Sequence, residues 1–254
     1  MRLKGQRVWL IGASSGIGAA LAVALAERGA TLAISARSRE GLEQTASLVA
    51  KAGGQARVET LDITSPGAAE AVAARLRESW GAIDMLIYGA GAWAPTDVAH
   101  LDVQSIEQQI AVNYVGLVRA IGAVLPPMVQ AKRGTIVGIA SVSAYVGLPR
   151  AEAYGSTKAA INYLLQSLRL DLRRRGVKVI TVNPGFVRTP LTANNDFPMP
   201  FMLEPEQAAR AIVRGIERGS GEVHFPLRLS LPLKVLGKLP RPVYEWVIAA
   251  TMKR

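Results

Sequence analysis

The chain has 254 residues, half of them hydrophobic, with a formal net charge of +11 and an isoelectric point of about 10.3. It contains no cysteine, which excludes disulfides and thiolate chemistry, and its two histidines, His100 and His224, lie too far apart in sequence to favour a histidine metal site or a Ser-His-Asp triad. The length suits a single α/β domain, so we expect residues 1–254 to share one large core.

Short apolar segments alternate with longer helical patterns along the chain. The sequence predicts strands at residues 8–11, 31–35, 57–61, 85–88, 134–140 and 177–182. It predicts helices at residues 16–28, 39–52, 66–80, 105–128, 152–175 and 205–218. This alternation is typical of a parallel sheet covered on both faces, and right-handed connections then give a doubly wound, Rossmann-type α/β fold.

A glycine-rich stretch, Gly-Ala-Ser-Ser-Gly-Ile-Gly at residues 12–18, joins the first predicted strand to the first predicted helix. Glycines at this point permit a tight turn, close approach of the backbone to a pyrophosphate, and close helix packing. The helix N-terminus adds free amide groups and the positive end of a dipole. In this position the stretch predicts a dinucleotide site, whereas a glycine-rich turn by itself is weak evidence.

The end of the second predicted strand, Ser-Ala-Arg-Ser-Arg at residues 35–39, carries no carboxylate. An acidic residue there would bind a ribose 2′-hydroxyl and repel a 2′-phosphate. Arg37 offers charge-assisted hydrogen bonds to a phosphate, and Arg39 is placed to assist. We therefore predict NADP(H) rather than NAD(H); the alternative is that both arginines are solvated loop residues.

Tyr154 and Lys158 lie four residues apart in a predicted helix, so they share one face about one turn apart. A free phenol has a pKa of about 10. A nearby ammonium stabilises the phenolate and lowers that pKa, which suits a general acid/base. The bare pattern is common on surface helices, so it gains meaning only from its context.

Taken together, these motifs resemble the single-domain short-chain dehydrogenase/reductase family over about residues 4–218. Asp62, after the third strand, matches the aspartate that contacts adenine in the family, and Asn113 matches the catalytic asparagine of the fourth helix. Ser141 precedes Tyr154 by the family's usual thirteen residues. The segment Asn-Pro-Gly-Phe-Val-Arg-Thr at 183–189 matches the one that flanks the nicotinamide.

The resemblance implies a role for each of four catalytic residues. Tyr154 protonates the carbonyl oxygen in reduction, Ser141 hydrogen-bonds that oxygen, Lys158 holds the nicotinamide ribose and lowers the tyrosine pKa, and Asn113 holds a water that relays protons. The cofactor-binding residues that the motifs and the resemblance indicate are Gly12, Ser14, Ser15, Gly16, Ile17, Gly18, Arg37, Asp62, Ile63, Ala90, Tyr154, Lys158, Pro184, Gly185, Val187 and Thr189.

Two positions depart from the family pattern. Ile11 stands where the family has threonine before the glycine turn, and Tyr-Gly-Ala-Gly at residues 88–91 replaces Asn-Asn-Ala-Gly. The family links these two sites by hydrogen bonds. We expect a paired loss of that contact, with apolar or backbone compensation.

Residues 220–254 form an atypical apolar and basic C-terminal extension, in place of the strand and Val-Asp-Gly-Gly-like ending of many relatives. We expect a short helix at 243–252, with Pro242 near its start. Similar tails occur in lipid-acting relatives such as 3-ketosphinganine reductases and membrane-associated hydroxysteroid dehydrogenases. The tail either packs on its own or a sister subunit, lies on a membrane surface, or caps the substrate pocket.

The apolar stretch at residues 197–203 lies where the family has its substrate loop, which indicates a hydrophobic pocket unless the stretch closes against the tail. We expect an NADP(H)-dependent carbonyl reductase or alcohol dehydrogenase acting on a hydrophobic substrate. One alternative is a membrane-associated ketosphinganine- or steroid-like reductase. The other is a non-catalytic NADP sensor, which the presence of all four catalytic residues disfavours.

The basic residues are dispersed and no nucleic-acid module is recognised, so we expect no nucleic-acid partner. The densest group, Arg173-Arg174-Arg175 with Lys178, complements the end of a helix dipole. No secretory signal pattern is seen, and no apolar run looks long enough to span a bilayer. We expect a cytoplasmic protein, with peripheral membrane contact as an option. The resemblance implies a homodimer or homotetramer formed through the helices that bear Asn113 and Tyr154.

Overall fold

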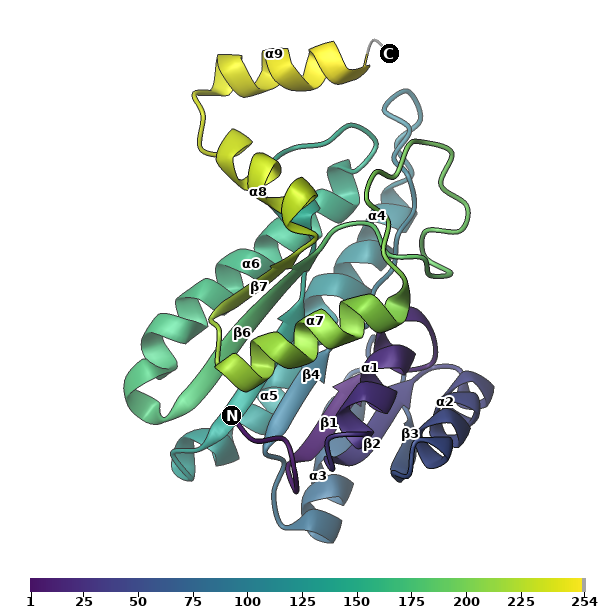
Figure 1. Ribbon diagram of the computed structural model, residues 1–254, viewed down its shortest axis with the longest axis vertical. Helices are drawn as coiled ribbons and strands as arrows, with labels where there is room; N and C mark the ends of the chain where they lie inside the picture. The colour runs from purple at the N-terminus through teal and green to yellow at the C-terminus, as the bar shows by residue number, and fades with distance from the viewer. Residues whose placement is uncertain (253–254) are drawn as a thin grey trace.

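The computed structural model describes residues 1–252 and is built around a seven-stranded parallel sheet (Figure 1). Its strands are β1 (Arg7–Ile11), β2 (Thr31–Ala36), β3 (Ala56–Thr60), β4 (Met85–Tyr88), β5 (Gly134–Ile139), β6 (Val177–Pro184) and β7 (Glu222–Phe225). They lie in the order β3-β2-β1-β4-β5-β6-β7, each pair parallel. The strand order reverses between β1 and β4, which is where this kind of sheet places a ligand.

The helices cover both faces of the sheet, because successive residues of a strand point to opposite sides. Val8 and Leu10 of β1 pack with α1, α2 and α7, whereas Trp9 and Ile11 pack with α3, α5 and α6. The helices are α1 (Gly16–Ala26), α2 (Arg39–Lys51), α3 (Ala68–Trp80), α4 (Val103–Ile110), α5 (Gly116–Gln130), α6 (Glu152–Leu172), α7 (Pro205–Arg218), α8 (Leu227–Leu236) and α9 (Arg241–Met252). The predicted doubly wound fold is confirmed.

The structure adds elements that the sequence did not predict. A π-helical turn, η1 (Ala111–Val115), joins α4 to α5 within the predicted long helix, and a short 3-10 turn, η2 (Val142–Ala144), follows β5. Strand β7 was missed because it has only four residues and lies at the sheet edge. Helix α8 was missed because Pro232 lies inside it, and proline usually breaks helices.

The segment Val103–Gln130 is one helical stretch of 28 residues with a mean hydropathy of 1.4. By length and composition it could span a membrane, so the expectation that no segment could was wrong. Leu117, Ile121 and Val124 of this stretch are buried in the core beneath the sheet. Because a covering helix of a soluble domain passes the same test, the stretch is weak evidence for membrane insertion.

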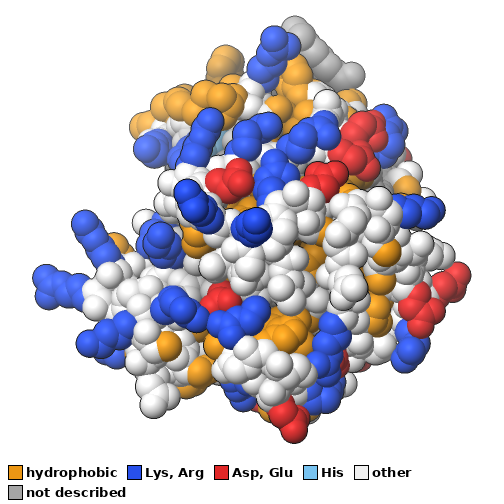
Figure 2. Space-filling model, turned by 60° about the horizontal axis from the view of Figure 1, so that its bottom comes forward, with side chains coloured by type: hydrophobic (Ala, Val, Ile, Leu, Met, Phe, Trp, Pro, Cys, Tyr) orange, Lys and Arg blue, Asp and Glu red, His pale blue; other side chains and the backbone are white. Residues whose placement is uncertain are grey.

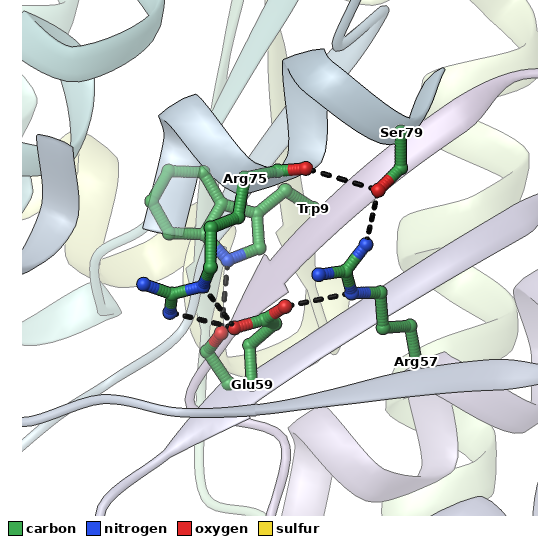
Figure 3. Close-up of polar contacts among 6 residues, drawn as sticks. Trp9, Arg57, Glu59, Arg75 and Ser79 are labelled. Carbon is green, nitrogen blue, oxygen red and sulfur yellow. Dashed lines mark hydrogen bonds and ion pairs between the residues drawn. The ribbon is translucent and has the colours of Figure 1, made fainter. Parts of the chain in front are cut away.

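Edge strand β3 is fastened to α3 by a buried carboxylate (Figure 3). Glu59 accepts hydrogen bonds from Arg57 Nε at 2.7 Å and from Arg75 Nη2 at 2.7 Å. Arg57 also donates to Ser79, whose hydroxyl donates to the Arg75 carbonyl. A buried carboxylate is stable only while its partners are in place, so this cluster fixes the strand that leads to Asp62.

Helices α8 and α9 stand beyond the carboxyl end of the sheet, at the top of Figure 1. Glu222 of β7 anchors α8: it accepts from Tyr145 Oη at 2.7 Å and from Asn183 Nδ2 at 3.1 Å, and it pairs with Lys234 of α8. These bonds hold the pKa of Glu222 below its usual value against the opposing effect of burial. The start of the extension is therefore part of the body of the protein.

Lys and Arg side chains are spread over the surface rather than gathered in one stripe, as one face of the molecule shows (Figure 2). Few Asp and Glu side chains interrupt them on that face. Dispersed positive charge favours solubility and the approach of anionic ligands more than the tracking of a nucleic-acid backbone.

Candidate active site

A cleft of about 810 Å³ opens at the carboxyl ends of the strands, at the switch point between β1 and β4. Every residue predicted to bind the cofactor lines this cleft, and so does Ser141. Asn113 alone among the four predicted catalytic residues is not at the cleft surface, because it is fully buried behind it.

The glycine turn is packed too tightly for any side chain at two positions. Gly12 has a φ of +88°, and a Cβ there would lie 2.3 Å from the Ala90 nitrogen. A Cβ at Gly18 would lie 1.9 Å from the Gly12 carbonyl oxygen. Among the described residues 1–252, no side-chain cap closes the N-terminus of α1 at Ser15, and its first turn carries no acidic side chain. This open helix end fits a pyrophosphate.

The two arginines after β2 have different surroundings. Arg37 lines the cleft, close enough to Asp62 to help lower its pKa, although hydrogen bonds from Thr64 are the larger cause. Arg39 instead donates to Glu43 at 2.8 Å on the exposed side of α2 and is not among the residues lining the cleft. Arg37 is therefore placed to meet a phosphate, and the structure does not support the expected assistance from Arg39.

Tyr154 and Lys158 lie on the same face of α6, with Lys158 Nζ 5.3 Å from the centre of the tyrosine ring. Lys158 is 4% exposed and donates to the Ile139 carbonyl at 3.1 Å. Burial lowers the pKa of Lys158 to about 8. Burial also raises the pKa of Tyr154 to about 12, with a hydrogen bond from Ser141 acting in the opposite direction.

The expected lowering of the Tyr154 pKa by the ammonium is therefore not seen in the protein alone. Desolvation disfavours both charged forms, the phenolate and the ammonium, and it is the larger effect. The site consequently holds Tyr154 in its protonated form, and the raised pKa also makes this phenol a weaker acid than a free tyrosine.

Asn113 ties three segments together from within η1. Its Oδ1 accepts from the Ala92 amide at 2.7 Å, and its Nδ2 donates to the Ala92 carbonyl and to Thr157 Oγ1, both at 3.0 Å. Both amide hydrogens are thus used by the protein. Tyr88 supports the same turn, because its buried hydroxyl donates to the Val112 carbonyl.

The two departures from the family pattern are compensated through the backbone. The amide of Gly89 donates to the Ile11 carbonyl at 2.8 Å, and a Cβ at Gly89 would lie 3.2 Å from Ile139 Cδ1. In this chain a backbone hydrogen bond and close apolar packing join the two positions, and the compensation for the family's side-chain link stays a prediction.

Sequence reasoning missed a group of loop residues next to Tyr154. The Trp93 and Tyr154 rings meet edge to face, with 5.2 Å between their centres and 79° between their planes. Trp93 Nε1 donates to Asn195 Oδ1 at 2.8 Å, across 102 residues of sequence. No spacing or periodicity could have indicated a pairing between two irregular loops.

Comparison with known proteins supports the fold and the family. The family model of the short chain dehydrogenases matches residues 6–198. An uncharacterised oxidoreductase of Myxococcus xanthus is 36% identical over 234 residues, 92% of each chain, and one of Staphylococcus saprophyticus is 33% identical over 211 residues, 82% of this chain and 90% of the other. A crystal structure of an actinorhodin polyketide ketoreductase with NADPH superposes with a TM-score of 0.82 at 26% identity, covering 89% of this chain and 97% of the other.

The family match spans the glycine turn, Asn113, Ser141, Tyr154, Lys158 and the segment after β6, all of which the structure brings to one end of the sheet. The chain therefore belongs to the short-chain dehydrogenase/reductase family of oxidoreductases, which use a nicotinamide cofactor.

Proposed function

We propose that the protein is an NADP(H)-dependent oxidoreductase that interconverts a hydrophobic carbonyl compound and its secondary alcohol. The observation that carries the proposal is that one cleft is lined both by Arg37 and by Ser141, Tyr154 and Lys158. We treat residues 1–254 as one domain with an extension at 220–254.

The bound cofactor supplies the hydride, so the chain has to orient a carbonyl and provide a proton. Tyr154 is the proton donor, since its raised pKa keeps it protonated at neutral pH. Ser141, which hydrogen-bonds Tyr154, is placed to bind the same carbonyl oxygen. Lys158 supplies a positive charge below its pKa of about 8 and binds the ribose hydroxyls.

Arg37 is the basis for proposing NADP(H) over NAD(H). Its guanidinium lies at the end of β2, where no carboxylate competes for a ribose hydroxyl, and it can form charge-assisted hydrogen bonds with a 2′-phosphate. The NADPH in the similar ketoreductase structure is consistent with this preference.

The hydrophobic substrate is proposed from the aromatic side chains near the site. Phe186 and Phe197 lie 6.1 Å apart, and Trp93 contacts Tyr154. Apolar and aromatic walls with a few polar groups are typical of pockets for hydrophobic small molecules.

The test is steady-state NADPH consumption over a carbonyl panel: a long-chain 3-ketone, a steroid ketone, aryl ketones and, as the polar control, dihydroxyacetone. We expect turnover of one or more apolar ketones and little of the polar one. A protein that binds NADPH but turns over no member of the panel would contradict the proposal and favour the NADP-sensor alternative.

A second candidate, peripheral attachment to a lipid surface, rests on the tail. Apolar side chains are exposed along α8, α9 and the turn between them, at Leu227, Leu231, Val235, Leu239, Val243 and Trp246. Arg228, Lys238 and Arg241 lie among them, and Glu245 is the single acidic residue after position 226. Apolar area combined with positive charge binds anionic bilayers.

Flotation with phosphatidylcholine vesicles, with and without phosphatidylglycerol, tests this candidate. We expect the full chain to bind the anionic vesicles and the double variant Leu231→Glu, Val235→Glu to lose binding. Leu48→Glu on α2, where the side chain is 49% exposed, is the matched control and should bind as the parent does. Absence of binding by the parent chain would exclude lipid attachment.

The oligomeric state is proposed from the same helices that carry the site. Val118 on α5, and Tyr163 and Leu170 on α6, are exposed apolar side chains suited to pairing with a second copy. Light scattering on the parent chain and on Leu170→Glu tests this. A parent chain that is monomeric at all concentrations would contradict it.

A further inference from the structure

Three loops meet beside Tyr154. The segment at 190–203 is linked to the loop after β4 by the Trp93–Asn195 hydrogen bond. It is also linked to the loop before α6, because Arg150 Nη1 pairs with Asp196 Oδ1 at 2.7 Å and the guanidinium lies 6.0 Å from the Phe197 ring centre. The two flanking loops are joined by a bond from the Thr96 amide to the Arg150 carbonyl at 3.0 Å. Figure 1 shows these loops rising together at the carboxyl end of the sheet.

The inner link, Trp93–Asn195, and the outer link, Arg150–Asp196, differ in how far water reaches them. The side chains of Arg150 and Asp196 are exposed, so their ion pair is screened by water and contributes little. Trp93 and Asn195 are partly buried, and a hydrogen bond there is exchanged for water less easily. The inner link is therefore the stronger constraint on the segment.

Trp93 connects the 190–203 segment to Tyr154, the proposed proton donor. The indole has its Nε1 on Asn195 and its ring against Tyr154, so one rigid side chain spans both. Trp93 does not line the cofactor cleft, so it bounds Tyr154 from outside that cleft. A ketone that reaches Tyr154 must then fit between the cofactor and this indole.

We propose that Trp93 is a positioning and specificity-determining residue: latched by Asn195, it closes the 190–203 segment over the site and forms a fixed aromatic wall that selects flat, apolar ketones. The inference deepens the proposed function and rests on it for the substrate. The closure of the segment can be measured without any substrate.

The first test is limited proteolysis with chymotrypsin, which cleaves after Phe201 once the segment opens; the bond after Phe197 resists cleavage because Pro198 follows it. We expect Trp93→Phe and Asn195→Ala to be cleaved about three- to tenfold faster than the parent, the effect of one lost hydrogen bond. The double variant should be no faster than Asn195→Ala alone, since that variant already lacks the Trp93–Asn195 bond; Asn195→Ala also loses a hydrogen bond from Asn195 Nδ2 to Met199 Sδ. Asn194→Ala, an exposed neighbour, is the control and should behave as the parent does.

Additive effects in the double variant, or parent-like cleavage in both single variants, would overturn the latch. Either result is independent of activity, so a failure of the latch is distinguished from a failure of the proposed function. Circular dichroism melting of each variant identifies any that fail to fold, and Asn195→Ala, which leaves the indole in place, then carries the test alone.

The second test uses acetophenone and 2-acetylnaphthalene as probes. We expect Asn195→Ala and Trp93→Phe to raise KM about three- to tenfold with kcat nearly unchanged, because the segment closes less often. Trp93→Ala should also shift kcat/KM in favour of the larger ketone.

An unchanged preference of Trp93→Ala between the two ketones would contradict the wall. A purely structural role of Trp93 would lower the melting temperature and leave this preference unchanged.

Discussion

The two halves of the site are built in different ways. The cofactor half consists of one tight turn and the ends of neighbouring parallel strands, where backbone positions such as Gly12 and Gly18 leave no room for change. The substrate half consists of three irregular loops and a tail, joined by side-chain contacts such as Trp93–Asn195 and Glu222–Lys234. Local backbone constraints therefore shape the turn that meets the cofactor, and we propose that long-range side-chain contacts shape the substrate side.

The largest effect on the cofactor half is expected from Gly18→Ala. The added methyl group would lie 1.9 Å from the Gly12 carbonyl oxygen, so α1 must move away from the turn. We expect NADPH affinity to fall more than about a hundredfold, since the helix end no longer meets the pyrophosphate. Fluorescence titration with NADPH measures the loss.

Gly122→Ala on α5 is the control, because a Cβ there meets no atom within 4 Å. It should bind NADPH normally and be slightly more stable, by about 0.5–1 kcal/mol. Tight NADPH binding by Gly18→Ala would show that the turn is less constrained than its geometry indicates.

Arg37→Ala should reduce the preference of the cofactor half for NADPH over NADH. Losing charge-assisted bonds to a 2′-phosphate is expected to weaken NADPH binding by about ten- to a hundredfold and leave NADH binding unchanged. Arg39→Ala is the matched control and should change neither, because Arg39 pairs with Glu43. The ratio of kcat/KM for NADPH and NADH measures this preference. A parent chain that prefers NADH would refute the assignment of NADP(H).

The pH profile separates the charge of Lys158 from the proton of Tyr154. Lys158 is charged below its pKa of about 8 and neutral above it, while Tyr154 keeps its proton up to about 12. Reductive kcat/KM should therefore be level up to about pH 8 and fall by about tenfold per pH unit above it. A profile that stays level to pH 10 would mean that the bound cofactor or substrate restores the Lys158 charge.

The smallest effect on NADPH binding is expected from a change on edge strand β3, at Glu59. Glu59→Gln weakens the bonds to Arg57 and Arg75 and should reduce the free energy of unfolding by about 1–3 kcal/mol. NADPH affinity should stay within about twofold, because the glycine turn is untouched. Glu78→Gln, an exposed residue on α3, should leave denaturant unfolding unchanged. Equal melting of the two variants would contradict a stabilising role for Glu59.

The cofactor half could be predicted from the sequence because its signals are local. Residues 12–18 lie between a strand and a helix, and Tyr154 and Lys158 are one helical turn apart, so spacing alone places them. The expected lowering of the Tyr154 pKa was wrong because burial, which no spacing shows, outweighs the ammonium. Arg37 and Arg39 look alike in sequence, and only the path of α2 separates them.

The substrate half resisted prediction for physical reasons. Trp93 and Asn195 are 102 residues apart in loops without periodicity, and their contact depends on how three loops fold over one another. Strand β7 and helix α8 were hidden by their shortness and by Pro232, although Glu222 binds them firmly to the body. Side-chain contacts over such distances leave no local pattern.

The central claim is that Tyr154 donates the proton in carbonyl reduction, and Tyr154→Phe tests it most directly. The variant keeps the ring against Trp93 and removes only the hydroxyl. With the best ketone of the panel, kcat should fall by about 10²- to 10⁴-fold while the Kd for NADPH stays nearly unchanged. Full turnover by Tyr154→Phe would contradict the account.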